Sequence, residues 1–282
     1  IDFLRFKVPP NEQDCLIPQQ LMMMKVADNA AKDAGLKEGS NVAVLVAMGL
    51  ELELHQYRGR VNLSTQIEES LQQQGIQLTD AQQQTLTNIA KDGLAFAAQL
   101  NQYTSFIGNI MASRISALWD FSGPAFTISA EENSVFRCLE VADNLCRTSE
   151  VDAVIIASVD LAGSLENISL RQNYGKVSET ASPSHDEVLD QNTWFVGEGA
   201  AAIVVKPQSK VAEGSVYASI DGLSFENGCE STSIALAANK ALKSAGITQA
   251  SLHSVEAHAS GFVEENQAEK IAFSKVYPGV NV

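Results

Sequence analysis

The sequence has few of the residues that would indicate a disulfide-stabilised, metal-binding or nucleic-acid-binding protein. Its four cysteines are scattered, and none has the close spacing typical of zinc sites: Cys15, Cys138, Cys146 and Cys229. Its four histidines are not paired at helical or zinc-finger spacing. Lysine and arginine number 19 against 34 acidic residues, which gives a formal net charge of −15. Because nucleic acids and anionic membranes require a cationic surface, we expect neither as a partner, and we expect no metal.

Long apolar runs are also missing. No window approaches the ~18 consecutive apolar residues of a transmembrane helix, and residues Ile1–Asp14 lack the pattern of a signal peptide. Hydrophobic residues make up 45% of the chain and the mean hydropathy is −0.03, as in soluble globular proteins. Sparse cysteines suit a reducing compartment, so we expect a cytoplasmic protein. Since the sequence opens in mid-flow and ends at YPGVNV directly after a helix-like segment, we expect one part of a longer chain.

Apolar periodicity alternates between helix and strand along the chain. Short Val-rich and Ile-rich runs predict buried strands, and i, i+3, i+4 spacing predicts helices. The predicted helices are Pro18–Leu36, Ser105–Leu118, Glu131–Arg147, Ser231–Ala245 and Glu264–Val276. The predicted strands are Asn41–Met48, Pro124–Ser129, Asp152–Val159, Trp194–Pro207, Ser215–Leu223 and Leu252–His258. This alternation predicts an α/β fold with a mostly parallel sheet covered on both faces.

Composition divides the chain further. We predict one domain at residues 1–207 and the start of a second at 208–282, with the boundary near Lys206–Gly214. Within the first, residues of about 51–100 are polar and rich in glutamine, which predicts an insertion of helices. The insertion is interpreted as a solvated covering of one face, with a binding element as the alternative.

The stretch Gly108–Leu145 organises the rest of the chain. It predicts a helix, a short buried strand, an abrupt corner at Ala130–Ser134 and a second helix. A corner of this kind often carries an enzyme's nucleophile, with the first N–H groups of the helix directed at developing charge. Here it carries Glu131 and Glu132 instead. Acids in the first turn are also favoured by the helix dipole alone, so a structural role stays open.

Two further positions combine unusual residues with a predicted strand end. His258 follows an apolar run at the edge where α/β sheets bind ligands, and could donate a hydrogen bond or transfer a proton. A purely structural histidine is the alternative. The Gly197–Gly199 turn lacks the pattern of a phosphate-binding loop, so close backbone packing is its better interpretation. The other histidines, His55, His185 and His253, lie in polar stretches and are expected to be exposed.

Three segments together resemble the β-ketoacyl synthase family of the thiolase fold. The run SRISALWDFSGPAFTISAEENS is similar to that family's NRISYxxDxxGPSxTVDTACSSS. The run TWFVGEGAAAIVVKP is similar to GFVxGEGAGxxVL, with Trp194 in place of its Phe. The run VEAHASGFVEENQAE is similar to VEAHGTGTxxGDxxE, which carries the first family histidine, here His258. The resemblance implies a layered α-β-α-β-α fold with mostly parallel mixed sheets, whose second half is incomplete in this chain.

The departures from the family pattern concern the chemistry. The family's acyl-accepting Cys falls on Glu132, and a carboxylate is a poor nucleophile toward a thioester. Phe262 replaces a small hydroxyl residue after His258 and could narrow the cavity, so Phe262 and Trp194 are predicted to contact substrate. The acid of the family's GD pair has become Asn266, although Glu269 is retained. The second family histidine lies outside this chain.

Loss of the nucleophile with retention of the frame is the pattern of chain-length-factor partners of ketosynthases. The resemblance therefore implies a Cys-less domain of a bacterial polyunsaturated fatty acid or polyketide synthase. Its implied partners are an active ketosynthase domain, in a thiolase-type dimer, and an acyl carrier protein. It needs no cofactor of its own, because the acyl chain is carried on the carrier's phosphopantetheine arm. Glu132 and His258 are the candidate catalytic residues.

Two alternatives remain open at this stage. The chain could condense or hydrolyse acyl thioesters with another nucleophile, and Cys138 is the nearest thiol. That residue lies nearly two turns beyond the corner on an apolar stripe, so core packing is the favoured interpretation. The chain could instead be a purely structural interaction domain of a multienzyme. Whether it is itself an enzyme is not decided by its sequence.

Overall fold

A computed structural model describes residues 2–8, 17–49, 54–94, 106–148, 150–178, 193–211 and 216–279. It divides into two compact units. The first comprises residues 1–167 and 197–211, and the second residues 168–196 and 212–282. The second unit thus includes residues 168–196, which lie before the predicted boundary at Lys206–Gly214. The division at 207/208 into two halves of the family fold stays a prediction.

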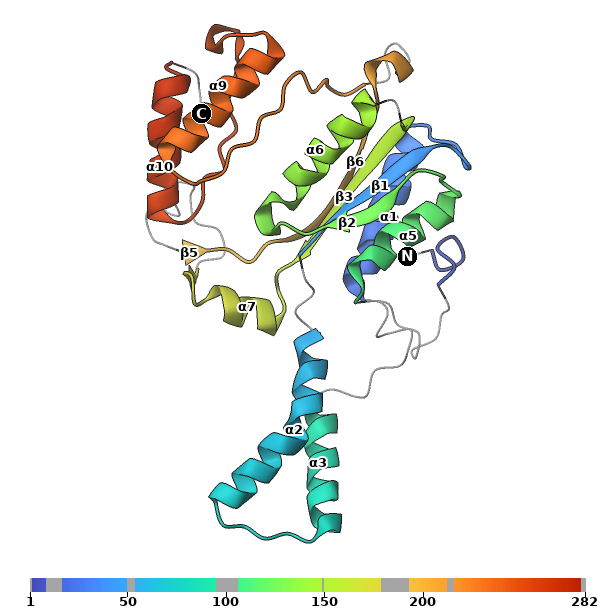
Figure 1. The fold of residues 1–282 in the computed structure, drawn as a ribbon, viewed down its shortest axis with the longest axis vertical. Helices are drawn as coiled ribbons and strands as arrows, with labels where there is room; N and C mark the ends of the chain where they lie inside the picture. The colour runs from blue at the N-terminus through green and yellow to red at the C-terminus, as the bar shows by residue number, and fades with distance from the viewer. Residues whose placement is uncertain are drawn as a thin grey trace. The chain divides into compact units, whose positions relative to one another are not determined.

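The first unit is built on a four-stranded mixed sheet of order β2-β1-β3-β6 (Figure 1). Its strands are β1 (Val42–Ala47), β2 (Ala125–Ile128), β3 (Ala153–Leu161) and β6 (Glu198–Val205). β1 pairs parallel with β2 and β3, whereas β6 pairs antiparallel with β3. Every residue of β1 is buried, as expected of a central parallel strand covered on both faces. The predicted α/β class and the positions of β1, β2 and β3 are confirmed.

Helices cover both faces of this sheet, because successive strand side chains point to opposite sides. On one face Val42, Val44 and Val46 belong to a core cluster with α1 (Pro18–Asp33) and α5 (Gly108–Trp119). On the other face Ala43, Leu45 and Ala47 pack against α6 (Ser134–Arg147). α6 is thereby fixed on the sheet directly after the corner that precedes it.

The approach to β2 is close enough to require glycine. At Gly123 a Cβ atom would lie 2.5 Å from both the carbonyl carbon and the carbonyl oxygen of Val42 in the central strand. No side chain fits between the backbones at that distance, so this position lets the chain enter β2 directly beside β1. Glycine at position 123 is thus a packing requirement of the sheet.

A buried carboxylate ties the N-terminal segment to two helices. Asp28 on α1 has only 3% of its surface exposed. Its Oδ1 accepts hydrogen bonds from Arg5 Nη2 at 2.8 Å and Trp119 Nε1 at 3.0 Å, and its Oδ2 accepts one from Lys32 Nζ at 2.5 Å. The Arg5 guanidinium lies 5.1 Å from the centroid of the Trp119 ring. This network holds residues 2–8 on the α1–α5 layer.

The polar segment forms a helical hairpin, α2 (Leu54–Gln73) and α3 (Asp80–Leu94), whose helices contact each other. Its predicted helical character is therefore confirmed. Most of its described side chains are exposed, and among them only Thr87 is buried.

The second unit contains the parallel pair β4 (Lys176–Val177) and β5 (Thr193–Trp194) and the packed helices α9 (Ser231–Ala245) and α10 (Val263–Val276). The remaining elements are α7 (Leu165–Arg171) and the short 3₁₀ turns η2 (Glu131–Asn133), η3 (Gln208–Lys210) and η4 (Gln249–Ser251). The start of the predicted helix at Ser105 lies outside the described residues.

Two details of the sequence-based assignment are wrong. Residues 216–223 and 252–258 form no strand apart from a single bridge residue, because a strand needs hydrogen bonds to a partner and the described part of this unit offers none there. β6 is only partly covered, with Ile203 47% exposed, because it lies at the edge of the described sheet.

Candidate functional site

The corner between β2 and α6 is closed by two serine side chains. Ser129 Oγ donates to the carbonyl of Met48 at 2.7 Å, which ties the end of β2 to the end of β1. Ser134, 4% exposed, accepts the Ala130 N–H at 2.9 Å and donates to the Glu131 carbonyl at 2.6 Å. The short turn η2 lies inside this loop. The corner is therefore a defined frame rather than an open loop.

The frame holds a strained residue beside the family's nucleophile position. Glu131 has φ +53°, in the left-handed region, which costs a residue with a Cβ roughly 1–2 kcal/mol. The Ser134 hydroxyl binds the carbonyl of this residue and the N–H before it, and so compensates part of that cost. The side chains of Glu131 and Glu132 are both exposed. The geometry thus presents two carboxylates at the start of α6.

Behind the corner, α6 is anchored in the core by an inert thiol. Cys138 is fully buried, and burial raises its pKa to about 11. At neutral pH it is therefore a neutral thiol without access to solvent, unlike reactive cysteines, which are thiolates in partly exposed sites. The prediction that Cys138 serves core packing is confirmed.

The outer side of β2 is held by the first turn of α5. Thr127 donates through Oγ1 to the carbonyl of Gly108 at 2.8 Å, and its N–H is accepted by Asn109 Oδ1 at 3.3 Å. β2 is an edge strand of the described sheet, so these bonds occupy polar groups that would otherwise face away from β1. The short strand leading to the corner is thus fixed from both sides.

The glycine turn has a different role from the one predicted. A Cβ at Gly197 or Gly199 would meet nothing within 4 Å, so the interpretation as close backbone packing is wrong. The contact is made by the residue between them: Glu198 Oε1 accepts the N–H of Gly163 at 3.0 Å. A Cβ at Gly163 would lie 2.6 Å from that oxygen. The close approach is therefore at Gly163, in the turn after β3.

In the second unit a carboxylate holds the segment that carries His258. Glu269 on α10 accepts the His258 N–H at 2.8 Å through Oε1 and the Ala259 N–H at 2.9 Å through Oε2. Ala259 has φ +50°, and the buried Ser260 accepts the Phe262 N–H through Oγ at 3.2 Å. The His258 side chain is exposed. Glu269 thus positions the backbone of this histidine.

Replacing Glu269 by glutamine should loosen this segment. The amide keeps the size of the side chain, but only its one oxygen can accept. One of the two backbone N–H groups therefore loses its acceptor, and the other exchanges a charged acceptor for a neutral one. We expect local stability to fall by about 1–2 kcal/mol. Hydrogen exchange of the His258 and Ala259 amides measures the effect, with Glu265→Gln, an exposed acid on α10, as the matched control. Equal exchange in the two variants would contradict the assignment.

Trp194 is held by contacts of its own. Its Nε1 donates to the carbonyl of Gly175 at 3.0 Å, and the guanidinium of Arg171 lies 5.6 Å from the centroid of its ring. Phe262 is half-buried at the position before α10. These contacts give Trp194 a structural role, whereas contact of Trp194 or Phe262 with substrate stays a prediction.

The predicted site residues are therefore distributed over the two units: Glu132 in the first, and Trp194, His258 and Phe262 in the second. The sequence did not reveal the part that Ser129 and Ser134 play in closing the corner. A serine four residues after Ala130 was visible, but its bonds to both sides of a strained residue depend on the conformation of the turn.

Of the other histidines, His253 is exposed as predicted, whereas the side chain of His55 and the whole of His185 lie outside the described part of the chain. Within the described ranges, no group of three or more His, Cys, Asp or Glu side chains is arranged to hold a metal ion. In the same ranges no helix has the length and hydropathy needed to cross a membrane.

Sequence comparison identifies the family. Residues 1–211 match the family described as beta-ketoacyl synthase, N-terminal domain. A subunit of the polyunsaturated fatty acid synthase of Thraustochytrium sp. is 38% identical over 224 residues, which cover 79% of this chain and 10% of that protein. Polyketide synthase ThaG of Burkholderia thailandensis is 27% identical over 295 residues, covering 99% of this chain and 4% of that protein. The chain thus spans a tenth or less of these relatives.

Solved structures agree in fold. The structure of PfaC keto synthase-chain length factor is 69% identical, with a TM-score of 0.90, and covers 100% of this chain and 30% of that one. The oxazolomycin ketosynthase domain OzmH KS7 from Streptomyces albus has a TM-score of 0.70 at 20% identity, covering 98% of this chain and 45% of that one. At that identity the second match informs on fold alone. The predicted thiolase-like α/β fold is confirmed.

Proposed function

This chain belongs to the β-ketoacyl synthase family, and we propose that it is a non-condensing, chain-length-factor-like domain of a polyunsaturated fatty acid or polyketide synthase. The observation that carries the proposal is the corner between β2 and α6. Its frame is intact, closed by Ser129 and Ser134, but it presents Glu132 where the family has its nucleophile. The 69% identity to the PfaC keto synthase-chain length factor supports the same assignment.

The chemistry available at this corner does not support condensation. If the Glu132 carboxylate attacked a thioester, it would expel the thiol and form an anhydride. Water would hydrolyse that anhydride, which returns the carboxylate and releases the acyl group as a free acid. The nearest thiol along α6, Cys138, is fully buried and protonated at neutral pH. The domain therefore acts through shape and hydrogen bonding rather than through a covalent acyl intermediate.

We propose that its partner is an active ketosynthase domain and that its substrate is an acyl chain on the phosphopantetheine arm of an acyl carrier protein. Pairing would use the sheet edge at β2, beyond the Thr127 N–H that Asn109 already binds, so that Glu132 reaches the acyl tunnel of the pair. His258 would donate a hydrogen bond to the carbonyl oxygen of a malonyl thioester and stabilise the enolate left when CO₂ departs. Glu269 would hold the backbone at that histidine.

The test is substitution at Glu132 in the assembled pair. Glu132→Ala removes the side chain from the proposed tunnel, so we expect a changed distribution of product chain lengths. We also expect malonyl decarboxylation to slow roughly a hundredfold or more on His258→Ala, as for the loss of one oxyanion donor. Glu131→Gln, a change at the neighbouring exposed acid, serves as the matched control and should leave both quantities unchanged.

Two results would count against the proposal. Unchanged chain lengths and unchanged decarboxylation in Glu132→Ala and His258→Ala, with the pair still assembled, would favour a purely structural interaction domain. Condensation by this chain without its partner would favour an enzyme with an unrecognised nucleophile. Assembly is checked by co-purification of the two domains before any activity is measured.

A further inference from the structure

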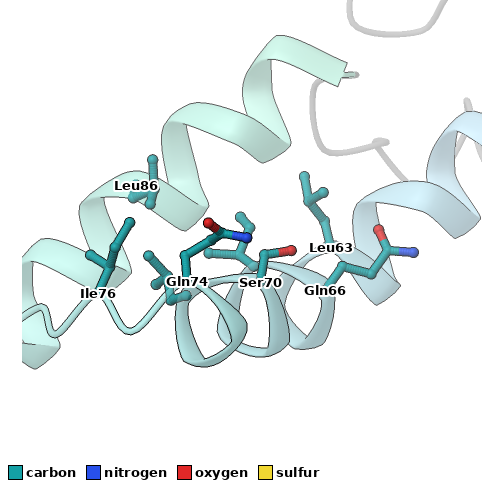
Figure 2. A pocket seen from close by; sticks show the side chains of 8 residues that line it. Leu63, Gln66, Ser70, Gln74, Ile76 and Leu86 are labelled. Carbon is teal, nitrogen blue, oxygen red and sulfur yellow. The ribbon is translucent and has the colours of Figure 1, made fainter.

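The α2–α3 hairpin carries two adjoining apolar grooves. The first, of about 400 Å³, is lined by Leu63, Gln66, Ile67, Ser70, Leu71, Gln74, Ile76 and Leu86. The second, of about 450 Å³, is lined by Leu78, Ala81, Gln82, Thr85, Leu86 and Ile89. Figure 2 shows the first groove, with Leu63 and Ser70 along α2, Gln74 directly after it, and Leu86 on α3, above Ile76 in this view. Leu86 borders both grooves and so forms the ridge between them.

The apolar side chains of these grooves are incompletely covered by the hairpin itself. Ile76 is 51% exposed, Leu86 39% and Ile89 67%. On α2 the apolar residues Leu63, Ile67 and Leu71 recur every fourth position, which forms one stripe along the helix. A pair of helices can cover only part of the apolar stripe that each helix carries, whereas a bundle of four helices encloses all of these stripes in a common core. The hairpin thus has the surface of half a four-helix bundle.

A small molecule is a poor fit for these grooves. Ligand sites usually enclose most of the surface of the molecule that they bind. Here three of the apolar lining residues, Ile76, Leu86 and Ile89, are themselves 39–67% exposed, so a ligand lying against them would keep much of its surface in water. A protein surface with its own apolar ridge covers both grooves at once.

The charge pattern of the hairpin favours an identical partner. No charged side chain lines either groove. The polar lining residues are amides and hydroxyls, which both donate and accept hydrogen bonds: Gln66, Ser70, Gln74, Gln82 and Thr85. Residues 54–94 contain three basic and four acidic residues, a net charge of −1 within a chain of −15. In a two-fold contact the same surface meets itself, so a charge in a groove would oppose its own copy, and no charged residue lines these grooves.

We propose that this hairpin is a self-association surface, which docks on the hairpin of a second copy of the chain to form an antiparallel four-helix bundle. The Leu86 ridge of each copy enters a groove of the other, and the glutamine rims pair with each other. An acidic or basic partner would find no complementary charge on the groove walls. This contact is separate from pairing with a ketosynthase through β2.

The oligomeric state of the intact protein tests the proposal. Leu86→Glu places a charge in both grooves of both copies and should weaken self-association roughly tenfold or more, as loss of a central apolar anchor does. Val61→Glu is the matched control, since Val61 lies on α2, is 75% exposed and lines neither groove. Sedimentation over a concentration series measures both variants. Equal weakening in both, or in neither, would overturn the proposal.

Photo-crosslinking tests it without relying on a charged variant. A benzophenone amino acid at Gln82, in a mixture of ¹⁴N- and ¹⁵N-labelled protein, should give mixed-isotope crosslinks to residues 54–94. Such crosslinks show that two copies meet through this surface. Crosslinks to another segment, to a different protein, or within one copy only would each contradict the proposal.

Discussion

Gly123→Ala is expected to destabilise the first unit by about 3 kcal/mol, at the upper end of the cost of overpacking. The added Cβ would lie 2.5 Å from the carbonyl carbon and oxygen of Val42, and both atoms belong to the backbone of the central strand. Neither can rotate away as a side-chain end could. β1 and β2 must therefore separate, which also disturbs the Ser129–Met48 bond that closes the corner.

The measurement is urea unfolding followed by the fluorescence of Trp119. The chain has two tryptophans, so a Trp194→Phe background leaves a signal from the first unit only. Gly199→Ala is the control, because a Cβ there meets nothing within 4 Å. It should be neutral or stabilise by up to about 1 kcal/mol through the unfolded chain. A Gly123→Ala midpoint equal to that of Gly199→Ala would show that β1 and β2 do not approach as closely as described.

Asp28→Asn is expected to cost about 3 kcal/mol, because removing the charge leaves two cations beside a buried amide. The carboxylate lies between Arg5 and Lys32 and is 3% exposed. Asparagine has the same size as aspartate, and its one oxygen can still accept the hydrogen bond from Trp119. Its NH₂ group, however, cannot accept the hydrogen bond that Lys32 donates. Residues 2–8 should then detach from the α1–α5 layer. Unfolding followed by Trp119 fluorescence, with Asp33→Asn on the same helix as the exposed control, measures the loss.

The same network makes stability depend on pH. Burial acts to raise the pKa of Asp28, but hydrogen bonds and charges from Arg5 and Lys32 outweigh it, so the pKa lies below its usual value. The unfolded state therefore takes up the proton first as pH falls. The stabilisation is complete above about pH 4, the ordinary range of an aspartate, and is lost below it. Wild type should lose stability faster than Asp28→Asn below pH 4, and parallel losses would contradict this assignment.

Local sequence determined most of the elements of the first unit. Helix α1 was predicted at Pro18–Leu36 and lies at Pro18–Asp33, with Gly35 in the left-handed conformation after its end. β1 was predicted at Asn41–Met48 and lies at Val42–Ala47. These predictions hold because apolar periodicity and helix-stop residues act within a few positions. The motifs around Glu132 and His258 likewise indicated the family from the sequence.

The tertiary structure alone decided the features that depend on distant partners. Residues 216–223 have a strand-like pattern but no partner strand among the described residues. The sequence of β6 indicated a buried strand, but β6 runs antiparallel to β3 at the edge of the described sheet. Asp28 meets Trp119 across 91 positions, and Glu198 meets Gly163 across 35. The corner at Glu132 combines both sources. Its acids are a property of the sequence, and the Ser134 bonds lie within the turn itself. The Ser129–Met48 bond, in contrast, depends on β1 and β2 lying side by side, which no local pattern encodes.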